Sequence, residues 1–399
     1  MITASTVFNA YLDVNALLAL ACAACFAIGY ILRLVGLGHT VLAQLRVMRA
    51  MFLAVVISPI FAVVGMTVVQ GGYVLPDSIP NLSDFIVSQY LQGKFAMNPS
   101  ALENLLSIRT QTVTAFFTSH SAVGFPLFGL LLIGIAVYAT RLALSILRLR
   151  RMIRDSYAWR RFGSLHLRMS DDISVPFSTR GWRNRYVVLP SAMITRSADL
   201  RIALAHEIQH LRQNDVTWEI FLEALRPLFF WNPAFYLWKR RVEQLRELSC
   251  DRQVMMRRGY KVAEYCDCLI NVCQNSLRPR RLFAIDAPIV ALVRTENHLF
   301  AQRSARLLKN RLLSLIDGKS ERNPTVMFVA LGLPMLALMF LASLAMQKSS
   351  DWSQDRLMLS TIINLERIHT TMRHQPLAGR SIDLAGLPPR HPISKSRKA

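Results

Sequence analysis

Four long runs of apolar residues constrain the fold of this chain more than any other feature. They cover residues 16–32, 50–70, 122–140 and 326–346, and none of them contains a charged side chain. A hydrocarbon core about 30 Å thick needs about 20 helical residues to cross it. Pro59 and Pro334 are compatible with membrane helices, which tolerate proline. The sequence therefore predicts a multi-pass α-helical membrane protein with four transmembrane helices.

The basic residues are distributed unevenly around these runs. Residues 1–15 contain no Lys or Arg, so the first run is predicted to be a span and not a removed leader. The loop 71–121 after the second run is slightly acidic, whereas basic residues follow the first and third runs: Arg33, Arg46, Arg49, Arg141, Arg148, Arg150, Arg151 and Arg154. The positive-inside rule then predicts both termini outside and segment 141–325 in the cytoplasm. The basic tail, 347–399, does not fit the rule, which long segments follow less strictly.

The net charge of +22 is explained by these loops, so we expect no direct nucleic-acid binding. The predicted organisation is a membrane region at 1–140 with an external loop at 71–121, a cytoplasmic domain at 141–325, a fourth span at 326–346 and a short external tail, 347–399. The cytoplasmic segment is long enough for one domain with its own core. Strand-like pieces at 165–169 and 186–189 flank a turn region between Pro176 and Gly181, and helical periodicity follows. We expect a mainly helical α+β domain with a small sheet.

The sequence His206-Glu207-Ile208-Gln209-His210 lies in one of these helical segments. Two histidines four positions apart share one face of a helix, so both imidazoles can bind one metal ion. The intervening Glu207 can reach the water beside the metal without binding the metal itself. This HExxH pattern is typical of zinc peptidases.

A catalytic zinc needs a third protein ligand. The helix that begins at Asn232-Pro233 carries Glu243, Glu247 and Asp251 on one face. Spacing alone leaves the choice between Glu243 and Glu247 open, with Asp251 suited to orient a ligand. These acids could also simply pair with neighbouring arginines. The six cysteines are scattered without zinc-finger spacing.

Further short motifs accompany HEIQH, and three predicted spans precede it while one follows. The motifs are Pro176-Phe177, Gly181, Val187-Val188-Leu189-Pro190, Asp215, Trp231-Asn232-Pro233, Glu247-Leu248-Ser249-Cys250-Asp251 and Leu307-Leu308-Lys309-Asn310-Arg311-Leu312. In these features the chain resembles the BlaR/MecR-type antirepressor metallopeptidases, which are integral-membrane gluzincins of the zincin type.

The resemblance implies a role for each motif residue. One zinc ion would be bound by His206, His210 and Glu247, with Glu207 as the general base. Asp251 and Asp215 would orient the ligands. An extended protein substrate would lie by strand addition against an edge strand formed by Tyr186, Val187, Val188 and Leu189.

The resemblance also implies location and partners. Such proteins lie in the bacterial inner membrane among lipids, and they relay an external signal by cutting themselves or a dimeric winged-helix repressor. A second copy of the chain is a further candidate partner. The β-lactam sensors of the family carry a Ser-x-x-Lys nucleophile after the last span, and residues 347–399 lack that motif, so we expect no covalent β-lactam binding. The alternatives are a housekeeping protease for misfolded membrane proteins and a proteolytically inactive membrane signalling protein.

Overall fold

A computed structural model of the protein describes residues 4–70, 82–92, 124–277, 290–291, 301–318 and 323–345, and the single residues Lys94, Asn98, Ala101, Leu102 and Val113. The chain divides into two compact units, one formed by Met1–Pro80 and Ser107–Gln347, the other by Asn81–Leu106 and Lys348–Ala399. In the smaller unit, helix α3 (Leu82–Leu91) buries Val87 together with Leu102. The predicted tail, 347–399, and most of the predicted loop, 71–121, lie outside the described residues.

Within the described residues, four helices of the larger unit are long and apolar enough to cross a membrane. They are α1 (Ala4–Leu34), α2 (Val41–Gln70), α5 (Gly124–Asp155) and α11 (Pro324–Ala345). Three of them, α1, α2 and α5, extend well beyond the predicted apolar runs. Helix α2 already contains Arg46 and Arg49, and α5 continues through the basic cluster to Asp155, because arginine is a good helix former and does not interrupt a helix.

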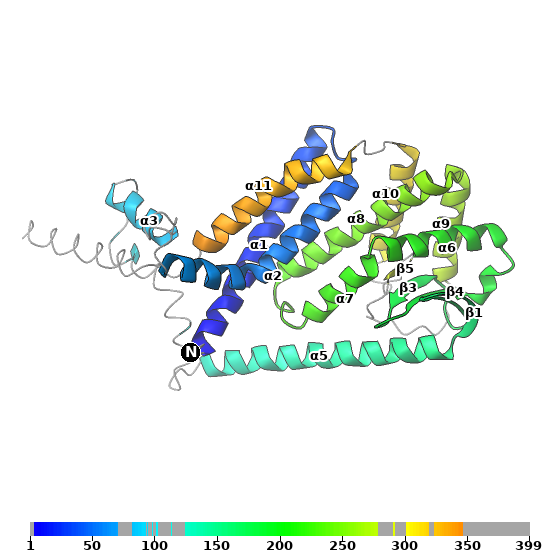
Figure 1. The fold of residues 1–399 in the computed structure, drawn as a ribbon, viewed down its shortest axis with the longest axis horizontal. Coiled ribbons are helices and arrows are strands. Elements are labelled where there is room, and N and C mark those ends of the chain that lie inside the picture. Colours follow the sequence, from blue (N-terminus) through cyan, green and yellow to red (C-terminus); the bar gives the residue numbers. More distant parts are fainter. Residues whose placement is uncertain are drawn as a thin grey trace, which may run out of the picture. The chain divides into compact units, whose positions relative to one another are not determined.

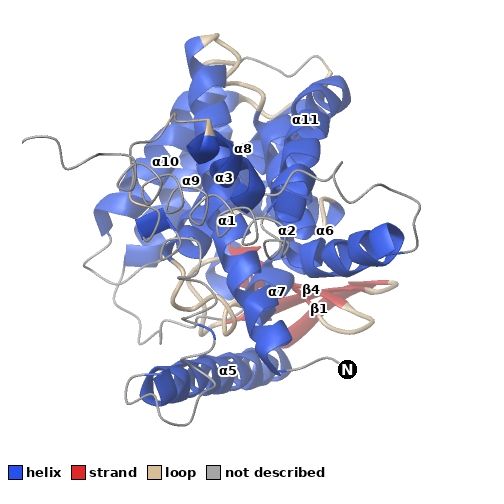
Figure 2. Cartoon of the chain, turned by 90° about the vertical axis from the view of Figure 1, so that its left-hand side faces the viewer, coloured by secondary structure: helices blue, strands red, loops and turns tan. Residues whose placement is uncertain are grey.

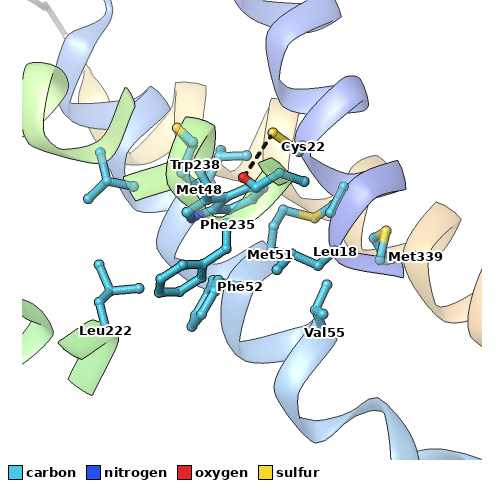
Figure 3. Close-up of a cluster of buried hydrophobic side chains, with 14 of the residues drawn as sticks. Leu18, Cys22, Met48, Met51, Phe52, Val55, Leu222, Phe235, Trp238 and Met339 are labelled. Carbon is cyan, nitrogen blue, oxygen red and sulfur yellow. Dashed lines mark hydrogen bonds between the residues drawn. The ribbon is translucent and has the colours of Figure 1, made fainter. Parts of the chain in front are cut away.

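Helix α8 (Pro233–Arg258) packs against α1 and α2, and α11 packs against both of these helices as well (Figure 1). Phe52 of α2 and Trp238 of α8 are almost completely buried in their shared core, where their ring centroids lie 6.0 Å apart. Leu18 and Met339 reach the same cluster from α1 and α11 (Figure 3). Helix α8, which carries Glu247, is thus anchored directly to the membrane helices.

The start and end of α8 follow from its sequence. The Asn232 side chain accepts a hydrogen bond from the Ala234 amide and caps the helix, and Pro233 occupies the first turn. Gly259 ends the helix with φ of 62°, a left-handed conformation that glycine adopts readily. The predicted start of this helix is confirmed.

The sheet is small and mixed, with strand order β1-β2-β4-β3-β5. Its strands are β1 (Tyr157–Phe162), β2 (Leu165–Ser170), β3 (Phe177–Arg180), β4 (Arg185–Pro190) and β5 (Val290–Ala291). Strands β2 and β4 run parallel, and the other neighbours are antiparallel. The two predicted strand pieces are confirmed, but β3 lies where the sequence predicted a turn region.

Successive residues of β4 face opposite sides of the sheet, as the period of two requires. Val187 and Leu189 pack with Leu211 of α6 (Ser197–Arg212), whereas Val188 packs with Leu149 near the end of α5. In Figure 2 the strands lie between α5 and the other helices. The HExxH helix therefore has a rigid sheet beneath it.

Among the described residues of the larger unit, the remaining α-helices are α7 (Asp215–Leu225), α9 (Val262–Leu277) and α10 (Ala301–Ile316). Tyr265 and Leu269 of α9 share a core with Ile202 of α6, Val254 of α8 and Leu315 of α10. This second core holds α10 beside the helices that carry the predicted site residues.

Candidate active site

Helix α6 brings the two histidines of the HExxH motif together. His206 and His210 are completely buried, and their Nε2 atoms lie 3.0 Å apart. Two nitrogens bound to one tetrahedral zinc at about 2.05 Å would be separated by roughly 3.3 Å. The two rings therefore already have the spacing of a pair of metal ligands.

The other nitrogen of each ring has a partner that fixes its tautomer. Nδ1 of His210 lies 2.7 Å from Asp215 Oδ2, a carboxylate that can only accept a hydrogen bond. Nδ1 of His206 lies 2.9 Å from the Tyr265 hydroxyl, which donates its own proton to Asp251 Oδ1 at 2.8 Å. Both Nδ1 atoms must therefore carry the proton in the neutral imidazoles. The lone pairs of the two Nε2 atoms then face each other, an arrangement suited to binding one cation between them.

A left-handed residue places Asp215 in this arrangement. Asn214, with φ of 56°, turns the chain sharply between α6 and α7. Asparagine tolerates this conformation better than most residues. Asp215 at the start of α7 thereby returns to the ring of His210, five positions earlier in the chain.

Glu247 of α8 is the third candidate metal ligand, beside the Nε2 atoms of the two histidines. Its Oε2 lies 3.6 Å from His206 Nε2, and its Oε1 lies 3.8 Å from His210 Nε2. Oε2 is buried and has no hydrogen-bond partner among the described residues. Glu243, the alternative that spacing left open, lies 3.9 Å from the Lys239 ammonium, so the structure brings Glu247 and not Glu243 to the histidines.

Cys250 is a geometric competitor for a metal ion. Ligand atoms of His206, His210 and Cys250 lie within 4.8 Å of one another. The Cys250 sulfur, however, lies 3.7 Å from Nδ1 of His206 and donates to the His206 carbonyl oxygen. It is therefore next to the protonated nitrogen, away from the two converging lone pairs, and Glu247 is the better third ligand.

The electrostatics of the site favour a positive charge between these residues. Burial lowers the pKa of His210, but the neighbouring Cys250, Glu247 and Asp215 outweigh it and raise the pKa to about 10. Burial raises the pKa of Glu247, but the charges of His210, Arg311 and Arg246 outweigh it and lower the pKa to about 2. The site thus attracts positive charge, which either a proton on the histidine pair or a divalent cation can supply.

Glu207 is completely buried, and neither of its carboxylate oxygens forms a well-aligned hydrogen bond with a described residue. Burial raises its pKa, and the charges of His210 and His206 and the nearby Ser178 hydroxyl only partly oppose this effect. An unpaired buried carboxylate is costly to maintain. A group of this kind, beside the histidine pair and with a raised pKa, is suited to accept a proton.

The predicted edge strand is wrong. Tyr186, Val187, Val188 and Leu189 lie in β4, which pairs with β2 on one side and with β3 on the other. The backbone hydrogen-bonding groups on both sides of β4 are thus already used, so no substrate can add to it. Strand β3 lies next to Glu207 through Ser178, and its first two residues pair with β5.

Three residues of the site were not predicted as such: Tyr265, Arg49 and Arg311. Arg311 Nε donates to Asp251 Oδ2 at 2.7 Å, and Arg49 Nη2 donates to Asp215 Oδ1 at 2.5 Å. Arg311 stands in the LLKNRL stretch, the one sequence signal that could have drawn attention to it. Tyr265 and Arg49 have no local signature, because their roles depend on contacts between distant segments.

The comparison with protein families agrees with this geometry. Residues 97–289 match the family model described as BlaR1 peptidase M56. No curated protein matches the chain. The matched segment contains both histidines, Glu207, Glu247 and Asp251. Over this segment the chain is similar to the peptidase domain of the M56 family.

Proposed function

We propose that this protein is a zinc metalloendopeptidase of the zincin type, in the membrane, with His206, His210 and Glu247 as zinc ligands. The observation that carries the proposal is the 3.0 Å separation of the Nε2 atoms of His206 and His210. Oxygens of Glu247 lie 3.6 Å from Nε2 of His206 and 3.8 Å from Nε2 of His210. Imidazole and carboxylate donors in this number are the ligand set of catalytic zinc, with one position left for water.

When bound, zinc would supply a Lewis acid that activates water and polarises the scissile carbonyl. Glu207 accepts the proton of the attacking water, and its raised pKa favours this role. The same carboxyl then returns the proton to the leaving amine. Asp215 and the Tyr265–Asp251 pair hold the two imidazoles in the tautomer that this arrangement needs.

The substrate is a protein segment in extended conformation, bound along β3. Ser178 of β3 lies beside Glu207, and β5 already pairs with this edge at Phe177 and Ser178. A substrate strand would take the place of β5 and use the same backbone hydrogen bonds.

The biological role that fits best is signalling from the bacterial inner membrane to a transcriptional repressor. The run of arginines at the end of α5 supports a cytoplasmic peptidase domain with both termini outside. A dimeric winged-helix repressor is the proposed substrate, and lipid and a second copy of the chain are the other proposed partners.

The test compares zinc content and proteolysis of the purified full-length protein in detergent, with fluorescently labelled casein as substrate. We expect one zinc per chain in the wild type. Glu207→Gln should retain zinc but lose activity by about 10²- to 10⁴-fold, the usual contribution of a general base. Glu264→Gln, an exposed glutamate on α9, is the matched control and should behave as wild type. Wild-type protein without zinc, or a Glu207→Gln variant as active as wild type, would contradict the proposal.

A further inference from the structure

The carboxylate behind His206 is held by an arginine from the helix that precedes the last membrane helix. Arg311 of α10 is buried and forms two hydrogen bonds of 2.7 Å with Asp251, from Nε to Oδ2 and from Nη2 to Oδ1. Its Nη1 lies 3.4 Å from Glu247 Oε2. One guanidinium thus contacts both the third ligand and the residue that, with Tyr265, orients His206.

The carboxylate behind His210 is held by an arginine of a membrane helix itself. Arg49 of α2 donates from Nη2 to Asp215 Oδ1 and from Nη1 to the Gln213 carbonyl oxygen. Asp215 is completely buried, and its other oxygen accepts from His210. Each histidine is therefore backed by a carboxylate and an arginine, directly for His210 and with the Tyr265 hydroxyl in between for His206.

Both arginines belong to the part of the fold that is tied to the membrane. Arg49 lies in candidate span α2, and only residues 317–323 separate α10 from candidate span α11. Helices α2 and α11 pack against each other, and Arg46 donates to Thr325 at the start of α11. A shift of α11 along α2 would thus move one arginine relative to the other.

We propose that Arg49 and Arg311 are positioning residues of the metal centre. Arg49 ties the orientation of His210 to candidate span α2, and Arg311 ties the orientation of His206 to α10, the helix that precedes α11. The proposal rests on the proposed zinc function. It adds that zinc affinity depends on the positions of α2 and α10 relative to the two histidines.

The physical basis is the rigidity of the guanidinium group. Its planar array of donors fixes a carboxylate in direction as well as in distance, which a lysine ammonium cannot do. The two hydrogen bonds from Arg311 accordingly fix the orientation of the Asp251 carboxylate. Burial raises its pKa, but the charge of Arg311 outweighs burial and holds the pKa well below its usual range. If the arginine is displaced, the carboxylate can rotate, and the imidazole hydrogen bond that depends on it weakens.

A purely structural role is the alternative, since each arginine also neutralises a buried acid. Such a role would lower thermal stability when the arginine is removed, but it would leave the zinc affinity of the folded protein unchanged. Zinc affinity and the spectrum of the cobalt-substituted protein therefore discriminate between the two, because both report ligand geometry and neither requires proteolytic turnover.

The experiment measures zinc affinity by competition with a chromophoric chelator, together with the melting temperature, on full-length protein in detergent. We expect Arg311→Gln and Arg49→Gln each to weaken zinc binding by about 10- to 100-fold, as is usual for outer-sphere partners of metal ligands, and to change the cobalt spectrum. Arg311→Lys should give an intermediate loss. Arg306→Gln, an exposed arginine on the same helix α10, is the matched control and should retain wild-type affinity.

A second variant covers the case in which Arg311→Gln does not fold. Arg311→Gln combined with Asp251→Asn removes the buried charges as a pair and avoids the penalty of an unpaired carboxylate. If Arg311 acts through Asp251, the double variant should bind zinc no more weakly than Asp251→Asn alone. Wild-type zinc affinity in folded Arg311→Gln or Arg49→Gln, or additive losses in the double variant, would overturn the inference. Absence of zinc from the wild type would instead overturn the proposed function itself.

Discussion

The Nε2 atoms of His206 and His210 lie 3.0 Å apart while their Nδ1 atoms point to separate buried hydrogen-bond networks. In both networks the partner of Nδ1 accepts a hydrogen bond, so each Nδ1 carries the proton. The lone pair of each neutral imidazole is then on Nε2, and the two Nε2 atoms face each other. The pair is thus prepared for a cation by its surroundings, and this relationship leads to tests of each neighbouring side chain.

Glu247 and Glu243 lie one helical turn apart on α8, and only Glu247 approaches the histidines. Glu247→Ala should remove a ligand and lower zinc occupancy to near background after dialysis. Glu243→Ala should retain one zinc per chain and serves as the matched control. Metal analysis of both proteins checks the prediction, and the reverse pattern would show that the third ligand has been assigned to the wrong glutamate.

Cys250 lies beside the protonated nitrogen of His206 and should not bind the metal. Cys250→Ala is expected to keep zinc affinity and proteolysis close to wild type. It should reduce the free energy of unfolding by roughly 1 kcal/mol, because a completely buried sulfur is lost. Loss of zinc in a folded Cys250→Ala protein would favour the two-histidine, one-cysteine set over Glu247.

Asp215 fixes the tautomer of His210 through a bond of 2.7 Å. Asp215→Ala should weaken zinc binding by about 10- to 100-fold, since the imidazole loses its orienting partner. Chelator competition measures the effect. Asp267→Ala, a substitution on α9 outside the site, provides the control, and equal affinities in the two variants would argue against an orienting role for Asp215.

Removal of the metal should separate its structural role from its catalytic one. Dialysis against a strong chelator should abolish hydrolysis and lower the melting temperature, because the ion binds only the folded state. Added Zn²⁺ should restore both properties, whereas Mg²⁺ should not, since imidazole donors suit zinc and magnesium prefers oxygen. Recovery with Mg²⁺ alone would contradict the proposed ligand set.

Trp238 joins α8 to the membrane helices and is only 1% exposed. Trp238→Ala should destabilise the protein by about 3–5 kcal/mol, the usual cost of removing a fully buried aromatic side chain. Trp182→Ala is the control, because Trp182 is 96% exposed and should change stability little. Thermal unfolding in detergent, followed by tryptophan-independent circular dichroism, compares the two.

Several elements could be predicted from the sequence because their causes are local. The length of an apolar run indicates a membrane helix, alternation predicted β2, and a short β-branched run predicted β4. The HExxH spacing placed two histidines on one face of α6, and Asn232 and Pro233 predicted the start of α8. Each of these depends on neighbours within a few positions along the chain.

Strand order could not be obtained in the same way. The resemblance placed β4 at an edge, whereas β3 separates it from β5 in the sheet. The sequence between Pro176 and Gly181 is short and rich in turn-forming residues, so β3 has no clear alternation of its own. It is a strand because β4 and β5 supply hydrogen-bond partners on either side.

The sequence by itself determined that this chain has four apolar spans and one HExxH helix, and that a downstream acidic helix offers a third ligand. The resemblance favoured Glu247 over Glu243, and the tertiary structure brought Glu247 to the histidines. Only the tertiary structure joined Arg49 to Asp215 across 166 positions and Arg311 to Asp251 across 60. The reason is physical. Helix periodicity and apolar length are properties of neighbouring residues, whereas the partner of a buried charge is decided by which distant segments the folded core brings together.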